Sequence, residues 1–397
     1  MQALLYCCCG VDVHDEMIET CIVKGFEDEP EIIRKQFQTM PKNLYEFAAY
    51  LNEHECYNIA MESTGIYWRP VYEVIEDYCG SNVQIVVTNA SHMRNIPGRK
   101  NDVDDAEWIA TLLQHGLLKS SFVPERIFRD LREASRLYRK LVGERSRYTN
   151  RIGKLLQAHG FKLSNVLSDI LGASGRNILK VLAERGSLSI SVVESCLRGR
   201  PKHTPHDIHV AISGSLNSFE RKILSVLLNK VETAEHNLNE LFFDMKEKAA
   251  PYHRQLSIID SVPGFDILAS LLLLSEISST PYKSFRSADA LCSWAGLSPR
   301  NDESAGKIKS RKTLPRGQYV KSILVQAAWS AVRSRENPFR DWFWSHKGKM
   351  GEKKALIAVS RQLLKTIYTL LSNNTLYDND IAIANRKRVY RPNSKTE

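Results

Sequence analysis

Four carboxylates lie at positions where the side chains of an α/β domain can meet. Asp12 ends an apolar, strand-like run, and Glu62 follows a second short strand. Asp102 and Asp105 are three residues apart, so on a helix they point to the same face. Carboxylates that converge repel each other unless a cation lies between them. Two divalent ions about 4 Å apart would satisfy the four acids and could hold a phosphodiester for displacement.

Taken singly, each of these acids also has a purely structural interpretation as a turn, strand-end or first-turn helix residue. Their order and settings together favour a metal site, and oxygen ligands favour Mg²⁺ or Mn²⁺ over zinc. The eight cysteines contain no Cys-x-x-Cys pair, so a zinc ribbon is not supported. Reduced thiols fit a cytoplasmic location.

The elements that would position the acids read as an α/β sandwich with a central sheet, because predicted strands and helices alternate over the first hundred residues. The predicted strands are residues 4–13, 17–23, 57–61 and 83–87, and the predicted helices are residues 44–51 and 102–113. The polar residues 14–16 predict a hairpin turn between the first two strands.

The middle of the chain shows two apolar seams with the 3-4 spacing of long paired helices. The first seam comprises Leu131, Ala134, Tyr138, Leu141, Tyr148, Ile152 and Leu155 and is broken only by Arg145. The second comprises Leu224, Leu227, Val231, Ala234, Leu238, Leu241 and Met245. Such seams predict a coiled coil, within one subunit or between two. Residues 199–207, with two prolines, are predicted to form a linker or loop.

The charge balance favours a polyanionic partner. The net charge is +10 and the pI is near 9.1, and neutralising phosphates releases condensed counterions. Arg132, Arg136 and Arg139 belong to a basic stripe on the first predicted long helix. That stripe is either a solvated face or a nucleic-acid-facing one. The longest apolar run, residues 267–274, is too short to cross a bilayer, and no signal peptide is visible.

A third part begins near residue 256. Residues 262–265 resemble the turn of a helix-hairpin-helix element and precede a predicted Leu-rich helix, residues 267–277. A polar, basic, glycine-containing loop covers residues 296–317. Helices are predicted over residues 319–333 and 352–371, followed by a basic tail.

The chain resembles the DEDD transposases of bacterial insertion sequences, the one-ten and eleven-eleven group that includes pilin-gene-inverting recombinases. The N-terminal motifs are Gly10-Val11-Asp12-Val13-His14, Met61-Glu62-Ser63-Thr64-Gly65 and Lys100-Asn101-Asp102-Val103-Asp104-Asp105-Ala106. The C-terminal motifs are Pro263-Gly264, Ala295-Gly296-Leu297-Ser298-Pro299-Arg300, Ser304-Ala305-Gly306-Lys307 and Arg316-Gly317. Together they cover nearly the whole chain.

The resemblance implies a RuvC-like, RNase H-type domain over residues 1–125, a helical coiled-coil region over 126–250, a mainly α-helical transposase domain over 251–375 and a tail over 376–397. It implies that Asp12, Glu62, Asp102 and Asp105 bind the metal and that Ser304 is the nucleophile. A serine hydroxyl could attack a phosphodiester and keep the bond energy for rejoining. The expected nucleic-acid contacts are Lys100, Arg132, Arg136, Arg139, Lys307, Arg311 and Arg316.

The resemblance also implies partners: donor and target DNA, a noncoding bridge RNA that guides the reaction, and a second or further copies of the chain in a dimer or tetramer. Two other functions remain open. One is a Holliday-junction-type nuclease that uses only the four acids and water. The other is a decayed, non-catalytic nucleic-acid-binding protein.

Overall fold

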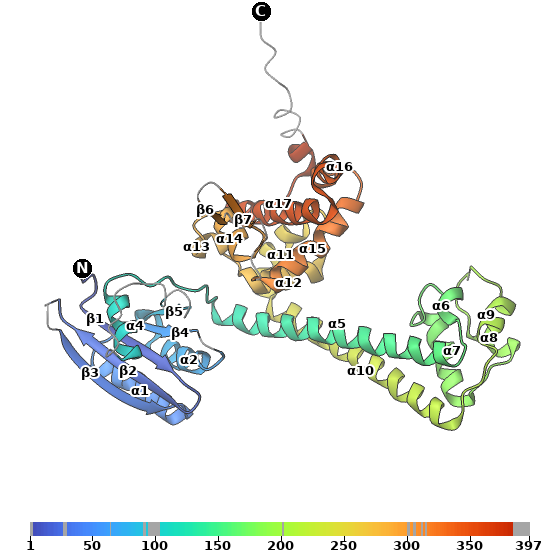
Figure 1. Cartoon of the computed structure of the whole chain (residues 1–397), viewed down its shortest axis with the longest axis horizontal. Helices are drawn as coiled ribbons and strands as arrows, with labels where there is room; N and C mark the ends of the chain where they lie inside the picture. The colour runs from blue at the N-terminus through green and yellow to red at the C-terminus, as the bar shows by residue number, and fades with distance from the viewer. Residues whose placement is uncertain are drawn as a thin grey trace, which may run out of the picture. The chain divides into compact units, whose positions relative to one another are not determined.

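The computed structural model describes residues 3–26, 30–63, 65–89, 93, 104–200, 202–299, 302–304, 307–310, 313 and 316–383. The chain forms two compact units, Met1–Val123 and Pro124–Glu397, here called unit 1 and unit 2. Figure 1 labels their elements. Among the described helices, none combines the length and hydrophobicity of a membrane span.

Unit 1 is built on a five-stranded mixed sheet with the strand order β3-β2-β1-β4-β5. The strands are β1 (Cys7–Val13), β2 (Met17–Lys24), β3 (Glu31–Gln38), β4 (Asn58–Glu62) and β5 (Gln84–Thr88). The first three strands are antiparallel, whereas β4 and β5 run parallel to β1. The predicted hairpin is confirmed. This mixed sheet with its helices is compatible with an RNase H-like domain.

Successive residues of β1 point to opposite faces of the sheet, so each face has its own core. Cys7, Cys9, Val11 and Val13 are buried in one core with residues of α1 (Pro41–Glu53) and α2 (Trp68–Cys79). Cys8 is buried on the other side with residues of α4 (Asp105–Gln114). All eight cysteines are free thiols and seven are buried, and burial raises the pKa of Cys8 to about 12.

Gly10 allows α4 to pack directly against β1. A Cβ atom at this position would lie 2.0 Å from the carbonyl oxygen of Ala106 and 2.4 Å from the amide nitrogen of Ala110. Both are backbone atoms in α4, so no side-chain rotation can relieve the contact. Any larger residue must push the helix away from the strand.

We therefore expect Gly10→Ala to lower the free energy of unfolding by about 3 kcal/mol, the cost of overpacking a rigid contact. Urea denaturation measures it. Gly143→Ala is the matched control, because a Cβ there meets nothing within 4 Å and alanine is favoured in a helix by about 1 kcal/mol. A Gly10→Ala protein as stable as wild type would contradict the close packing.

Unit 2 contains two long helices, α5 (Arg126–Ala158) and α10 (Ser218–Lys248), which lie side by side (Figure 1). Three contacts set their register: Asp130 with Lys248 at 2.7 Å, Arg145 with Glu235 at 2.7 Å and His159 with Glu220 at 3.5 Å. Residues that come later in α5 contact residues that come earlier in α10, so the two helices run antiparallel. The two long helices thus pack against each other within one chain, and a coiled coil formed by the two predicted seams stays a prediction.

Four short helices pack at the end of this pair: α6 (Leu163–Val166), α7 (Ala173–Arg185), α8 (Ile190–Cys196) and α9 (Pro205–Ala211). We call residues 161–216 the tip. Its core includes Ile178 and Leu182 of α7 with Ile152 of α5 and Leu224 of α10. The predicted loop over 199–207 is too long, because α9 begins at Pro205. Thr204 and Asp207 form a capping box there.

The rest of unit 2 is mainly helical. Its helices are α11 (His253–Asp260), α12 (Ile267–Ile277), α13 (Pro281–Ser284), α14 (Ala288–Trp294), α15 (Gln318–Arg333), α16 (Pro338–Met350) and α17 (Glu352–Asn373). The three helices predicted after residue 256 are confirmed to within two residues at each end. Residues 384–397, most of the predicted tail, lie outside the described part of the chain.

Candidate active site

The sheet of unit 1 brings two of the predicted acids side by side. Strands β1 and β4 are parallel and pair Gly10 with Ala60 and Val11 with Met61. The same register places Asp12 next to Glu62, at the carboxyl ends of both strands. Neighbours in register share a face of the sheet, and this face carries α4.

The third acid comes from α4, which begins at Asp105. The contact between Gly10 and this helix holds its first turn near the end of β1. Burial raises the pKa of Asp12 above its usual range, and the negative charges of Asp105 and Glu62 raise it further. Asp12, whose side chain is 18% exposed, therefore experiences the repulsion that the convergence of acids predicts.

Two further residues at this place were missed from the sequence. The Nε2 atom of His14 lies 3.1 Å from Oδ2 of Asp12 and opposes the rise in its pKa. Thr88, in β5, pairs with Glu62 of the neighbouring strand β4. It is fully buried, and among the described residues its hydroxyl has no hydrogen-bond partner. His14 could have been found from the sequence, because it lies two positions after Asp12 and residues two apart on a strand point to the same face.

The donor set fits a hard divalent cation, because carboxylates that repel one another are the ligands that Mg²⁺ and Mn²⁺ accept. The predicted fourth acid, Asp102, lies outside the described residues, as do Lys100 and Arg311. Within the described residues, no three His, Cys, Asp or Glu side chains are close enough to hold a metal ion. Asp12, Glu62 and Asp105 are all described, so in this structure they lie farther apart than the ligands of one bound ion would.

Ser304 lies in a β-hairpin of unit 2. Strand β6 (Asp302–Ser304) pairs with β7 (Lys307–Ser310), and Ser304 and Lys307 are opposite each other at the end of the hairpin. The sequence predicted a polar loop here, and the structure shows that part of this loop forms the antiparallel strand pair β6–β7. Arg316, another predicted contact, is exposed near the end of the same loop.

Tight backbone packing at the base of this loop holds Gly317 against Ala295. A Cβ atom at Gly317 would lie 2.5 Å from the backbone carbon of Ala295, and Gly317 has a φ of 64°, which glycine adopts without strain. Pro299 and Thr313 form a β-bridge. Lys321 in α15 donates a hydrogen bond to the Thr313 hydroxyl at 2.7 Å. These contacts join the loop to the start of α15.

Both parts of the chain match transposase family models. A model described as a transposase of the DEDD IS110 type matches residues 9–160. The transposase IS116/IS110/IS902 family model matches residues 256–343. The chain belongs to the IS110 family of DEDD transposases. The two matched segments make up more than half of the transposase and include Asp12, Glu62, Asp105 and Ser304. No curated protein matched the sequence.

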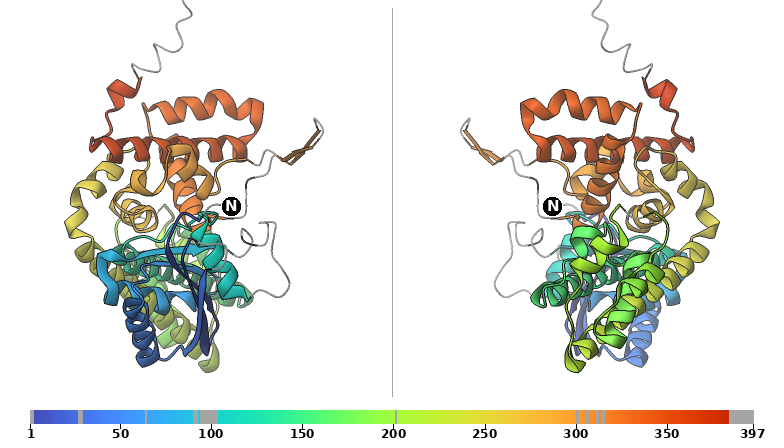
Figure 2. Two further views of the ribbon diagram at one scale, coloured as in Figure 1. Left: turned by 90° about the vertical axis from the view of Figure 1, so that its left-hand side faces the viewer. Right: turned by 90° about the vertical axis from the view of Figure 1, so that its right-hand side faces the viewer.

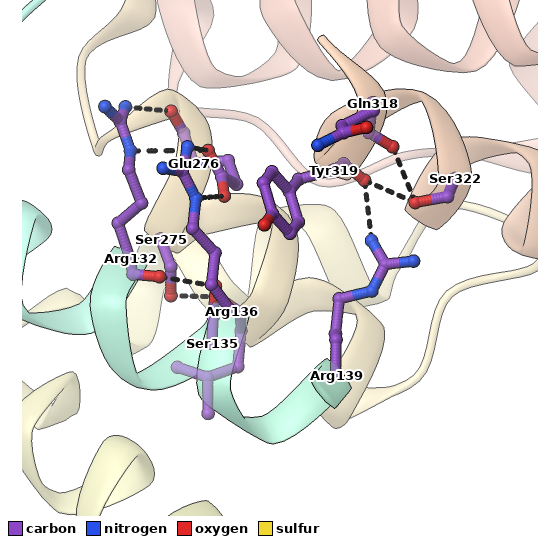
Figure 3. A network of polar contacts seen from close by, with 10 residues as sticks. Arg132, Ser135, Arg136, Arg139, Ser275, Glu276, Gln318, Tyr319 and Ser322 are labelled. Atoms are coloured by element: carbon purple, nitrogen blue, oxygen red, sulfur yellow. Dashed lines mark hydrogen bonds and ion pairs between the residues drawn. The ribbon is translucent and has the colours of Figure 1, made fainter. Parts of the chain in front are cut away.

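The basic stripe of the transposase joins α5 to the C-terminal helices (Figure 3). Arg136 donates two hydrogen bonds to the Glu276 carboxylate in α12, at 2.8 and 3.0 Å. Arg132 donates to the Glu276 carbonyl oxygen at 2.6 Å. Arg139 donates to the Tyr319 carbonyl oxygen in α15 at 2.8 Å, and Arg136 lies over the Tyr319 ring. Contact of these arginines with nucleic acid stays a prediction.

Glu276 is 1% exposed, so its carboxylate contacts these arginines in place of water. Burial lowers the pKa of Arg132 to about 10, and the nearby Glu276 carboxylate opposes that effect. The transposase therefore keeps a buried ion cluster where α5, α12 and α15 meet. Since α15 follows the loop that carries Ser304, this cluster also anchors the helix next to the hairpin.

We expect Glu276→Gln to destabilise unit 2 by about 3 kcal/mol, because it leaves the buried Arg132 without its counter-charge. Urea denaturation measures the loss. Asp289→Asn is the matched control: Asp289 also meets two cations, Arg361 and Lys365, but is 56% exposed. Exposed pairs contribute less than about 1 kcal/mol. Equal losses for the two variants would show that burial of Glu276 has no energetic consequence.

Proposed function

We propose that this transposase cuts and rejoins DNA with two groups of residues, the carboxylates of unit 1 and Ser304 of unit 2. The register that places Asp12 beside Glu62, together with the effect of the nearby Asp105 and Glu62 charges on the pKa of Asp12, is the observation that supports the proposal most directly. The role of Ser304 rests on the motif Ser304-Ala305-Gly306-Lys307 and fits its position at the end of a hairpin.

The carboxylates Asp12, Glu62, Asp102 and Asp105 would hold Mg²⁺ or Mn²⁺. A bound ion would polarise the phosphodiester and offset its growing negative charge. The protein orients its ligands in advance, because Asp12 and Glu62 are fixed by strand register and Asp105 by the packing of α4 on Gly10. Such preorganisation lowers the cost of reaching the transition state.

The Ser304 hydroxyl would attack phosphorus. Its proton is lost, the bond from phosphorus to a deoxyribose oxygen breaks, and that oxygen takes up a proton. The strand is then held as a phosphoserine ester. A hydroxyl at the end of another strand attacks this ester and releases the serine, so rejoining needs no external energy source. Lys307 and Arg311 would stabilise the charge on the phosphate.

The remaining features of the proposal follow from the family. A noncoding bridge RNA would choose the donor and target DNA, and two or four copies of the chain would assemble on it. The functional division would be residues 1–125, 126–250, 251–375 and 376–397, with α5 and α10 forming the coiled-coil part.

A plasmid recombination assay tests the function. The wild-type chain is supplied with Mg²⁺ and with a plasmid that carries the native element, its noncoding segment and its flanking DNA. We expect excised and reinserted element, seen by sequencing of the junctions. Cut but unjoined DNA would indicate the Holliday-junction-type nuclease instead. Binding without any cutting would indicate a decayed nucleic-acid-binding protein.

A further inference from the structure

A hollow in the tip lies between the two segments that the family models match. It measures about 530 Å³, and its walls are the α6–α7 region and the segment between α8 and α9. The right-hand view of Figure 2 looks onto this end of unit 2, with the green helices of the tip toward the viewer. The proposed carboxylate and serine chemistry does not use this part of the chain.

The described lining of the hollow is basic. Arg198, Arg200 and Lys202 line it together with one carboxylate, Asp169. The Oδ1 atom of Asp169 accepts a hydrogen bond from the amide of Leu171 at 2.8 Å, so this carboxylate is engaged in its own loop. Arg200 and Lys202 are exposed, and within the described chain no acidic group forms an ion pair with either. Their charges are available to an anion.

The two walls are fixed to each other. The Ser174 hydroxyl accepts a hydrogen bond from the Arg198 amide at 2.8 Å, and the Asn177 side chain donates to the Cys196 carbonyl at 3.0 Å. The Arg198 guanidinium donates to the carbonyls of Ser195 and Leu197, each at 2.8 Å. The hollow is therefore formed before any ligand arrives, which reduces the entropic cost of binding.

A helix end adds to this positive potential. Helix α7, 13 residues long, begins at Ala173 in the lining, has no side-chain cap and carries no acid in its first turn. The amide groups and the dipole at a helix N-terminus favour an anion. Cationic side chains and a helix N-terminus around one preformed hollow form a combination that suits a phosphate group.

We propose that this hollow binds backbone phosphates of duplex DNA away from the bond that is cut. DNA is the substrate of the transposase family, and the proposal needs no particular cleavage mechanism. The 20 positions of α5 between Arg132, in the Glu276 cluster, and Ile152, in the core of the tip, span about 30 Å. That length is close to one turn of duplex. A phosphate contact at the hollow would increase the affinity for DNA and fix the position of the duplex on the protein, without recognising the base sequence.

The test is the salt dependence of DNA binding by the full-length protein. Fluorescence anisotropy is measured with a labelled DNA duplex of arbitrary sequence at several salt concentrations. For Arg200→Ser with Lys202→Ser, we expect the slope of log affinity against log salt to become shallower by about 2, near 0.9 for each lost phosphate contact. Lys222→Ser with Lys230→Ser, exposed on α10, removes the same charge elsewhere as the control.

Three outcomes would overturn the proposal: an unchanged slope in the tip variant, the same change in the control variant, or a change seen with an RNA duplex of equal length but not with DNA. Thermal unfolding followed by circular dichroism checks that both variants fold. Because the assay measures binding alone, it is independent of whether the chain recombines DNA or uses Ser304.

Discussion

Replacing Ser304 with alanine is expected to lower recombination by at least about 10³-fold, because removal of a nucleophile removes the whole covalent route. The same substitution should abolish any adduct in which protein and DNA are covalently joined. Denaturing gel electrophoresis of a reaction with labelled DNA detects that adduct, and the plasmid assay measures the recombination.

Ser310→Ala is the matched control. Ser310 lies in β7 of the same hairpin, paired with Asp302, so the substitution makes an identical chemical change in the same ladder. We expect it to recombine DNA like wild type. Normal adduct formation by the Ser304→Ala protein would contradict the assignment of Ser304 as the nucleophile. Cutting by Ser304→Ala that is lost only when an acid is replaced would identify a carboxylate-only nuclease.

Asp12→Asn is expected to lower recombination by more than about 100-fold while making the metal-free protein more stable. The loss of activity follows from the removal of a charged ligand. The gain in stability follows from the pKa of Asp12, which burial and the charges of Asp105 and Glu62 raise in the folded state. A raised pKa means that folding disfavours the ionised carboxylate.

The sign of this effect gives its pH dependence. At a pH below the unfolded pKa of an aspartate, near 4, Asp12 is protonated in both states and the penalty is absent. The penalty grows as the pH rises through that value and is complete above the raised pKa of the folded state. The increase in Tm of Asp12→Asn in EDTA should therefore appear at neutral pH and vanish in acid.

Differential scanning fluorimetry with EDTA and with Mg²⁺ measures both consequences. Mg²⁺ should raise the Tm of wild type through linkage and should raise that of Asp12→Asn much less. Asp15→Asn, in the exposed turn after β1, is the control and should behave like wild type in both conditions. A lower Tm for Asp12→Asn in EDTA at neutral pH would contradict the repulsion inferred at this site.

Several elements with apolar patterns were predicted from the sequence, but α2 and α7 were not, although each has buried apolar residues at helical spacing. Strands β1 and β2 are buried almost throughout, so their composition indicated the hairpin. Strand β3 was missed because Phe37 is its one buried residue, as befits the edge of a sheet. The start of α9 was missed although Thr204 and Asp207 have the spacing of a capping box.

The positions of the candidate residues were predictable where they depend on strand ends and not where they depend on distant partners. Asp12 and Glu62 could be placed because each lies at the carboxyl end of its own strand. The ion pair of Arg136 with Glu276 could not be foreseen, since 140 positions separate them and Glu276 is the one charged residue of a Leu-rich helix. A stripe of arginines has the same pattern whether it faces water, nucleic acid or a buried carboxylate.

The way the chain enters and leaves the tip has a consequence for how this protein can change. The Lys162 amide donates to the Ala211 carbonyl at 2.7 Å, and a Cβ at Gly214 would lie 3.2 Å from the His159 carbonyl oxygen. The two ends of the segment are thus neighbours, and the family match stops at residue 160. The tip nevertheless shares its core with the long helices, through Ile152 of α5 and Leu224 of α10. Insertions in the surface loops of the tip should therefore be tolerated, whereas removal of the whole tip would expose these apolar residues of α5 and α10 to water.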